Sequence, residues 1–141
     1  VIVVKGDGEA AFVSGADISE FGSERTSDDA QREYNNITEA AYSAPSRASK
    51  PVIAAIRGIC MGGGLGLAAA CDIRICETNT KFRMPAARLG LGYSVDGISR
   101  FVSLVGPQNV LDIFMTAKTF DGHEALRMGF VAAAAEPDQF E

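Results

Sequence analysis

The sequence predicts an α/β protein in which short apolar strands alternate with helices, and three observations support this prediction. Strand-like apolar runs recur along the chain, in VIVVKG (1–6), VIAAIR (52–57) and DIRIC (72–76). Helix start and stop signals lie between and after these runs. The chain has 141 residues, of which 47% are hydrophobic and 22% charged. We therefore expect one domain, residues 1–141, built around one core.

The N-terminal third predicts a buried strand, a turn and a helix. Residues 1–6 form the strand, and Gly6-Asp7-Gly8 forms the turn. The segment AFVSGADISEF (11–21) holds a short apolar piece, Gly15 and a helix start. A polar helix is expected to begin at Ser27-Asp28-Asp29. Its predicted apolar face consists of Ile37, Ala40, Ala41 and Ala44.

The middle of the chain predicts two more strands around a helix of small residues. Pro45 and Pro51 bracket a connector, and residues 52–57 form the second buried strand. The helix runs from Gly62 to about Cys71, and residues 72–76 form the third strand. Residues 78–97 are interrupted by proline and glycine, which predicts a loop-rich segment.

The C-terminal third predicts three helices and a final strand or connector. The first helix ends at Gly106, and Pro107 opens the second. Asp121 and Glu124 fit a capping box for the third, which Gly129 ends. The segment FVAAAAE then starts a strand or a connector.

Charge and cysteine content exclude several function classes. The net charge of −5 argues against a nucleic-acid partner. Cys60, Cys71 and Cys76 are odd in number and lack zinc-ligand spacing, which favours reduced, buried thiols in a reducing, cytoplasmic compartment. We expect neither a signal peptide nor a membrane-spanning stretch. The single histidine, His123, is expected to be exposed, and no metal site is expected.

The glycines between positions 62 and 66 allow three interpretations. Gly64 to Ala69 matches G-x-G-x-x-A, a form of the dinucleotide-binding fingerprint, although Gly58-Ile59-Cys60-Met61 separates it from its strand. Small residues at helical spacing also permit close packing without a ligand. Finally, a helix N-terminus without Cβ atoms can hold a carbonyl oxygen that gains negative charge, provided that a second donor exists.

Four motifs in order resemble the enoyl-CoA hydratase/isomerase, or crotonase, superfamily. IAAIRGICMGGGLGLAAACDI resembles its glycine-rich signature, and AFVSGADISEF its AF-x-x-GAD-[IL] segment. FRMPAARLGL resembles its F-x-x-P-E loop, and TAKTFDGHEALRMGFV its segment ending in G-[LF]-V. The resemblance covers nearly the whole chain. It implies a fold of repeated ββα units, with further strands before Val1 and helices after Glu141, so that 1–141 is an incomplete domain.

The resemblance also implies the ligand and its site. The family binds acyl-CoA thioesters and stabilises a thioester enolate with two backbone amides, which here correspond to Ala16 and Gly63. Coenzyme A is part of the substrate, so no separate cofactor is implied. The family's assembly implies a homotrimer or a dimer of trimers. The implied substrate-binding residues are Ser14, Ala16, Asp17, Ile18, Gly62, Gly63 and Tyr93.

The chain departs from the family at its two usual proton-transfer positions. The two glutamates of typical hydratases correspond to Gly66 and Ala86, neither of which can transfer a proton. Asp96 matches the position of a catalytic aspartate in dienoyl-CoA isomerases and aryl-CoA dehalogenases, and it is our candidate acid/base. An Asp96 helix cap or Asx turn is the alternative.

Other polar residues near the motifs have more ordinary interpretations. Glu20 is expected to face solvent, Arg88 to form a surface ion pair, and Asp72 to serve structure. Cys60 shows no sign of an activated thiolate.

These observations predict an enzyme of the hydratase/isomerase type. With one carboxylate, double-bond isomerisation of an enoyl-CoA fits more easily than hydration. Two alternatives from other function classes remain: a non-catalytic acyl-CoA binding protein of the same fold, and a dinucleotide-binding domain.

Overall fold

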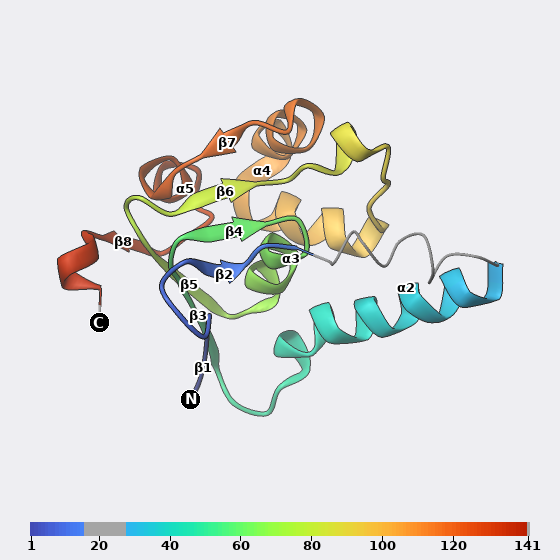
Figure 1. Cartoon of the computed structure of the whole chain (residues 1–141), viewed down its shortest axis with the longest axis horizontal. Helices are drawn as coiled ribbons and strands as arrows, with labels where there is room; N and C mark the ends of the chain where they lie inside the picture. The colour runs from blue at the N-terminus through green and yellow to red at the C-terminus, as the bar shows by residue number, and fades with distance from the viewer. Residues whose placement is uncertain (16–27, 141) are drawn as a thin grey trace.

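The computed structural model describes residues 1–15 and 28–140, and the chain is built from repeated strand–strand–helix units (Figure 1). The first unit is β1 (Ile2–Lys5), β2 (Ala11–Val13) and α2 (Asp28–Ser43). The second is β3 (Val52–Ile56), β4 (Ile59–Met61) and α3 (Gly63–Ala70). The third is β5 (Ile73–Glu77), β6 (Lys81–Arg83) and α4 (Val95–Thr116). These units confirm the predicted ββα architecture.

The remaining elements are short. The single-turn helices η2 (Pro45–Arg47) and η3 (Ala86–Leu89) precede β3 and α4. The chain continues through β7 (Thr119–Phe120), α5 (Gly122–Met128), β8 (Ala133–Ala135) and η4 (Pro137–Gln139).

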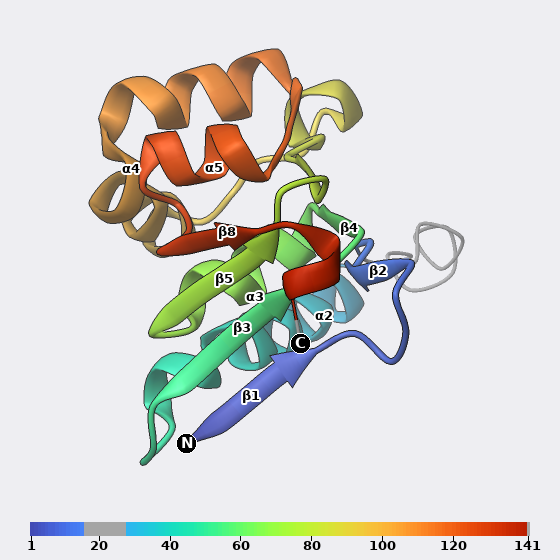
Figure 2. The ribbon, with the colours of Figure 1, turned by 90° about the vertical axis from the view of Figure 1, so that its left-hand side faces the viewer.

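The two strands of each unit belong to different sheets. The first sheet has the order β1-β3-β5-β8, and all its neighbouring strands are parallel. The second has the order β2-β4-β6-β7, with β7 antiparallel to β6. Figure 2 shows the first sheet side by side, with α2 and α3 behind it and α4 and α5 beyond β8. The helices α2, α3 and α5 each follow a strand of the second sheet and return the chain to the first, whereas α4 leads to β7 of the second sheet.

Aromatic rings join the second sheet to the C-terminal helices. Phe82 of β6 stacks on Phe120 of β7, with ring centroids 5.3 Å apart. Phe101 of α4 stacks on Phe130, with centroids 5.9 Å apart, and the Phe130 ring stands edge-on to Phe82. Phe82, Phe101 and Phe130 are each at most 1% exposed, so they form the centre of the core.

Side-chain hydrogen bonds fix the ends of several elements. Asp72 Oδ2 accepts a hydrogen bond from the Val52 amide at 2.7 Å, which ties the start of β5 to the start of β3. Asp121 accepts one from the Glu124 amide at 3.0 Å and caps α5, and Gly129 ends this helix at φ 81°. Asp72 therefore has the predicted structural role, and Asp121 the predicted capping role.

The structure corrects two predictions about burial. The strand β1 was expected to be buried, but it is the edge strand of its sheet, and Ile2 and Val3 are 42% and 54% exposed. The helix α2 forms as predicted, but Ile37 on its predicted apolar face is 63% exposed. The face that turns inward instead carries Tyr34, Thr38 and Tyr42, all partly buried. Of these side chains, Tyr42 reaches the start of α3, where its hydroxyl lies next to Gly63.

Two short strands, β4 and β6, lie where the sequence predicted connectors or loops. Gly106, at φ 77°, kinks α4 and separates its two helical halves, as predicted. Among the described residues, none of the helices has the length and apolar character that a bilayer crossing requires.

Candidate functional site

A cleft of about 800 Å³ lies where α2, the start of α3 and the segment from β6 to α4 meet. This volume is in the usual range of small-molecule sites. Five elements or segments contribute to its lining: the end of β2, the inward face of α2, the glycines of α3, the 84–94 segment and the first turns of α4. Of the predicted site residues, Ser14, Gly62, Gly63, Tyr93 and Asp96 line this cleft. Ala16, Asp17, Ile18 and Glu20 lie outside the described residues.

The backbone at Gly62 leaves an amide free at the start of α3. Gly62 has φ 53° and ψ −115°, a conformation that a residue with a side chain rarely adopts. Its N–H donates to the Arg83 carbonyl at 3.0 Å, and its carbonyl accepts from the Leu65 amide at 3.1 Å. Gly63 is the first residue of the helix, so its N–H makes no intrahelical bond. An acceptor in the cleft can therefore use the Gly63 amide.

The glycines of α3 differ in what surrounds them. A Cβ on Gly63 would overlap the hydroxyl oxygen of Tyr42, and one on Gly64 would overlap the carbonyl oxygen of Val13. A Cβ on Gly66 would meet no atom within 4 Å. Close packing inside the protein therefore accounts for Gly64. Close packing also contributes at Gly63, but there the nearest atom is the hydroxyl oxygen of Tyr42, at the end of a side chain that lines the cleft.

Two phenols face the cleft from opposite segments. Tyr42 comes from α2, and Tyr93 from the segment that precedes α4. The Tyr93 ring stands edge-on to Phe114, with centroids 5.2 Å apart. Burial raises the pKa of Tyr93 to about 12, and Tyr42 nearby adds to this rise. Burial also raises the pKa of Tyr42 above its usual value. Both side chains are therefore neutral hydrogen-bond donors at neutral pH.

Asp96 lies in the first turn of α4 and is exposed at the rim of the cleft. The alternative interpretation as a helix cap is wrong, because Ser94 is the N-cap and its hydroxyl accepts from the Gly97 amide at 3.1 Å. Within the described part of the chain, the Asp96 carboxylate has no hydrogen bond or ion pair. The carboxylate is therefore available to a ligand.

The two positions that lack the family's glutamates both line the cleft but differ in exposure. Gly66 has open space in front of it, so a longer side chain would fit there. Ala86 begins η3 and is only 6% exposed, because most of its small side chain packs in the core. Neither position supplies a proton donor or acceptor.

Three other residues that the sequence analysis considered as functional candidates do not contribute to the cleft. His123 is exposed on α5 and does not line the cleft, as expected. Cys60 is fully buried, and burial raises the pKa of its thiol, so it is not an activated thiolate. Arg88 is exposed, but no ion pair involves it within residues 1–15 and 28–140, contrary to the predicted surface pair.

Sequence reasoning missed the contribution of α2 to the cleft. Tyr34, Thr38 and Tyr42 recur every four residues, which places them on one helical face. That spacing was visible in the sequence, but the alanines at similar spacing suggested a different face. Glu39 and Arg100 also line the cleft and were not singled out.

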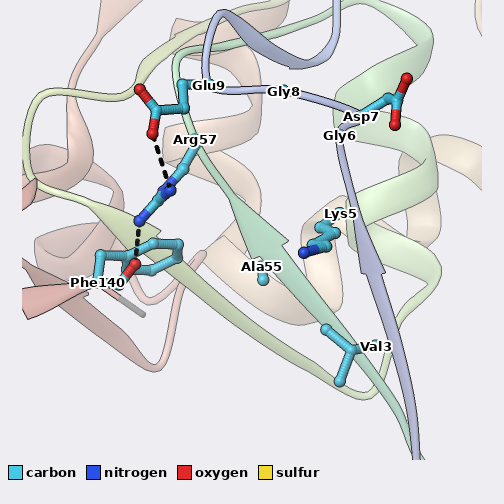
Figure 3. Close-up of a pocket in the computed structure, with 9 residues that line it drawn as sticks. All are labelled: Val3, Lys5, Gly6, Asp7, Gly8, Glu9, Ala55, Arg57 and Phe140. Atoms are coloured by element: carbon cyan, nitrogen blue, oxygen red, sulfur yellow. Dashed lines mark hydrogen bonds and ion pairs between the residues drawn. The ribbon is translucent and has the colours of Figure 1, made fainter.

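A second cavity of about 690 Å³ lies beside β1 and β3 (Figure 3). Arg57 lines this cavity, but its guanidinium already forms ion pairs and a hydrogen bond with other residues of the protein. Arg57 Nη1 lies 3.7 Å from Glu9 Oε1, Nε lies 2.9 Å from Glu77 Oε1, and Nη2 donates to the Phe140 carbonyl. The guanidinium also lies over the Phe140 ring, 5.4 Å from its centroid. These contacts fasten the C-terminal segment to β3.

Neither a metal site nor a dinucleotide loop is evident in the described residues. Residues 1–15 and 28–140 contain no cluster of three or more side chains suited to a metal ion. The G-x-G-x-x-A pattern begins at Gly64, the second residue of α3, rather than in a loop after a strand. The Val13 carbonyl also occupies the space in front of Gly64, where a phosphate would have to approach.

A family model and two related sequences all match proteins described as enoyl-CoA hydratases or isomerases. The family model described as enoyl-CoA hydratase/isomerase matches residues 1–141. A short-chain-enoyl-CoA hydratase of Clostridium acetobutylicum is 36% identical over 98% of this chain and 52% of that protein. A peroxisomal Delta(3,5)-Delta(2,4)-dienoyl-CoA isomerase of Arabidopsis thaliana is 34% identical over 94% of this chain and 51% of that protein.

A solved structure agrees with these relatives. The crystal structure of an enoyl-CoA hydratase/carnithine racemase from Magnetospirillum magneticum superposes with a TM-score of 0.92 at 32% identity. The superposition covers 98% of this chain and 52% of the Magnetospirillum protein. The chain thus spans about half the length of the relatives that it matches.

Proposed function

The chain belongs to the enoyl-CoA hydratase/isomerase family, and from this premise we propose that it acts on an enoyl-CoA thioester in the cleft beside α3. The thioester oxygen accepts hydrogen bonds from the Gly63 amide and, by resemblance, from the Ala16 amide. The CoA chain runs along Ser14, Asp17 and Ile18, and Tyr93 contacts the acyl group. Coenzyme A enters as part of the substrate.

The observation that carries this proposal is the free Gly63 amide at the first turn of α3, inside the cleft. Removing a proton beside a thioester, or adding a nucleophile to its conjugated double bond, places negative charge on the thioester oxygen. Fixed amides stabilise this charge without having to reorient, and one such donor contributes about 3 kcal/mol to the transition state. The partial positive charge at the helix N-terminus acts in the same direction.

Asp96 is the proposed proton-transfer residue. A single carboxylate can remove a proton from one carbon of the substrate and return it to another, which moves the double bond. Hydration requires a group to activate water as well, and Gly66 and Ala86 supply none. Isomerisation of the double bond is therefore the reaction that the available residues support best.

The test uses two CoA thioesters that differ in double-bond position. Crotonyl-CoA has a conjugated double bond and loses near-ultraviolet absorbance on hydration, whereas its β,γ-unsaturated isomer gains absorbance on isomerisation. We expect the unaltered protein to convert the β,γ-isomer and the Asp96→Asn variant to lose this activity. Rapid hydration of crotonyl-CoA that survives Asp96→Asn would contradict the assignment.

A non-catalytic acyl-CoA binding protein is the second candidate, because both glutamate positions of the family lack a carboxylate here. Binding of several acyl-CoA thioesters without turnover of either isomer would favour it. A homotrimer or dimer of trimers and a cytoplasmic location remain expectations. Size-exclusion chromatography with light scattering tests the former, and fractionation of cells tests the latter.

A further inference from the structure

We propose that the Tyr42 hydroxyl donates a hydrogen bond to the thioester oxygen, beside the Gly63 amide. This inference rests on the proposed function, because it assigns a third donor to the same oxygen. Tyr42 belongs to none of the four motifs that carry the family resemblance.

The fold brings this hydroxyl to the start of α3. Tyr42 lies on the inward face of α2, in its last turn, and lines the cleft together with Gly62 and Gly63. Its phenol oxygen is so close to Gly63 that a methyl group on that residue would overlap it. An acceptor bound to the Gly63 amide is therefore next to the Tyr42 hydroxyl as well.

The hydroxyl has no competing partner. Within the described part of the chain, Tyr42 makes no side-chain hydrogen bond and no ring contact. Serine hydroxyls on the same stretch of chain behave differently: Ser43 and Ser46 both donate to backbone carbonyls nearby. A partly buried hydroxyl without a partner loses hydration and gains nothing in return, unless a ligand completes its hydrogen bonding.

The chemical state of Tyr42 suits donation. Burial raises the pKa of its phenol, and the neighbouring Tyr34 adds to the rise. The phenol therefore keeps its proton at neutral pH and donates it in a hydrogen bond. A donor that is already in place strengthens most when the oxygen becomes negatively charged, as in an enolate. Tyr42 should thus favour the enolate over the uncharged thioester.

The experiment compares two ligands on the full-length natural protein. Butyryl-CoA is a saturated thioester with an uncharged oxygen, whereas acetoacetyl-CoA readily forms an enolate with a near-ultraviolet band. Dissociation constants are measured by calorimetry for the unaltered protein, for Tyr42→Phe and for Ser46→Ala. Ser46→Ala is the control, because it removes a hydroxyl from the same stretch of chain at a residue that does not line the cleft.

We expect Tyr42→Phe to weaken acetoacetyl-CoA binding at least about tenfold more than butyryl-CoA binding and to reduce the bound enolate band. Ser46→Ala should leave the ratio of the two constants unchanged. Equal weakening of both ligands by Tyr42→Phe, or no weakening, would overturn the inference while leaving the proposed function intact. If the unaltered protein binds neither thioester, the proposed function itself fails, and the inference fails with it.

Discussion

The carbonyl oxygen of Val13, at the end of β2, occupies the space that a side chain on Gly64 would need. The strand and the helix therefore approach each other through backbone atoms alone. This contact holds the first turn of α3 against the second sheet and thereby fixes the position of the Gly63 amide in the cleft.

Gly64→Ala should destabilise the protein by about 2 kcal/mol or more, because its Cβ would meet backbone that cannot rotate away. Gly66→Ala should instead stabilise it by about 0.5–1 kcal/mol, because the site is open and alanine favours helix. Urea denaturation of the two variants measures the difference. Similar stabilities for both would contradict the close contact at Val13.

Carboxylates placed at the two positions that lack glutamate should have opposite consequences for folding. Gly66→Glu should be tolerated within about 1 kcal/mol, because its side chain can extend into the cleft. Ala86→Glu should cost about 3 kcal/mol or more, because it would bury a charge without a partner. The thermal midpoints of the two variants, with Ala86→Gly as a size control, would show this. An Ala86→Glu protein as stable as Gly66→Glu would refute it.

Variants at Ser94 and Asp96 should have different effects: one should lower the stability of the protein, and the other should abolish its activity. Ser94→Ala removes the helix cap and should cost about 1 kcal/mol of unfolding free energy while retaining activity. Asp96→Asn should retain stability within about 0.5 kcal/mol and abolish isomerisation of the β,γ-enoyl-CoA. Denaturant melts and steady-state rates are measured on both. The reverse pattern would assign Asp96 to the cap and contradict its proposed role.

The phenol of Tyr93 should make stability fall in the alkaline range. Its pKa is about 12 in the folded protein, compared with 10.0 for an unperturbed tyrosine. Below pH 10 the phenol is neutral in both states, and its contribution to stability is fully present. Between pH 10 and 12 the unfolded chain loses this proton first, so the contribution is progressively lost. Denaturant melts from pH 9 upward should show a shallower decline for Tyr93→Phe than for the unaltered protein.

Asp72 should contribute to stability by joining two parallel strands. Its carboxylate accepts from the Val52 amide at 2.7 Å, and Asp72→Ala would leave that amide without its acceptor. We expect a loss of about 1–2 kcal/mol, partly recovered in Asp72→Asn, which keeps an acceptor oxygen. Guanidinium melts of the two variants measure the loss. No destabilisation in Asp72→Ala would show that water replaces the bond at no cost.

Elements with clear local signals were predictable from the sequence. The strand β3 is a continuous apolar run, and α5 has its cap at Asp121 and its stop at Gly129. Strands β4 and β6 were missed because each has only three residues, with glycine on both sides of β4 and Pro85 two residues after β6. Their strand conformation depends on pairing with distant segments, such as Ile59 with Lys81. Local patterns do not carry that information.

The cleft was predictable only in part. The glycines of α3 and the segment containing Tyr93 and Asp96 were found through motifs, and the structure brings them together. Tyr42 was missed, because its significance comes from contact with Gly63 in the following unit. The inward face of α2 was also predicted wrongly. Alanine spacing marks a helical face, but Tyr34 and Tyr42 turn toward the cleft, and Tyr42 lies next to Gly63 of α3.

Proton exchange at the α-carbon of a saturated thioester tests the central claim most directly. The full-length protein is incubated with butyryl-CoA in heavy water, and deuterium uptake is followed by mass spectrometry, beside the Asp96→Asn variant. The account predicts uptake at the α-carbon with the unaltered protein and its loss in Asp96→Asn, since exchange requires both a stabilised enolate and a proton-transfer group. Undiminished uptake in Asp96→Asn would contradict the role of Asp96. Binding without any uptake in the unaltered protein would contradict enolate chemistry in this cleft.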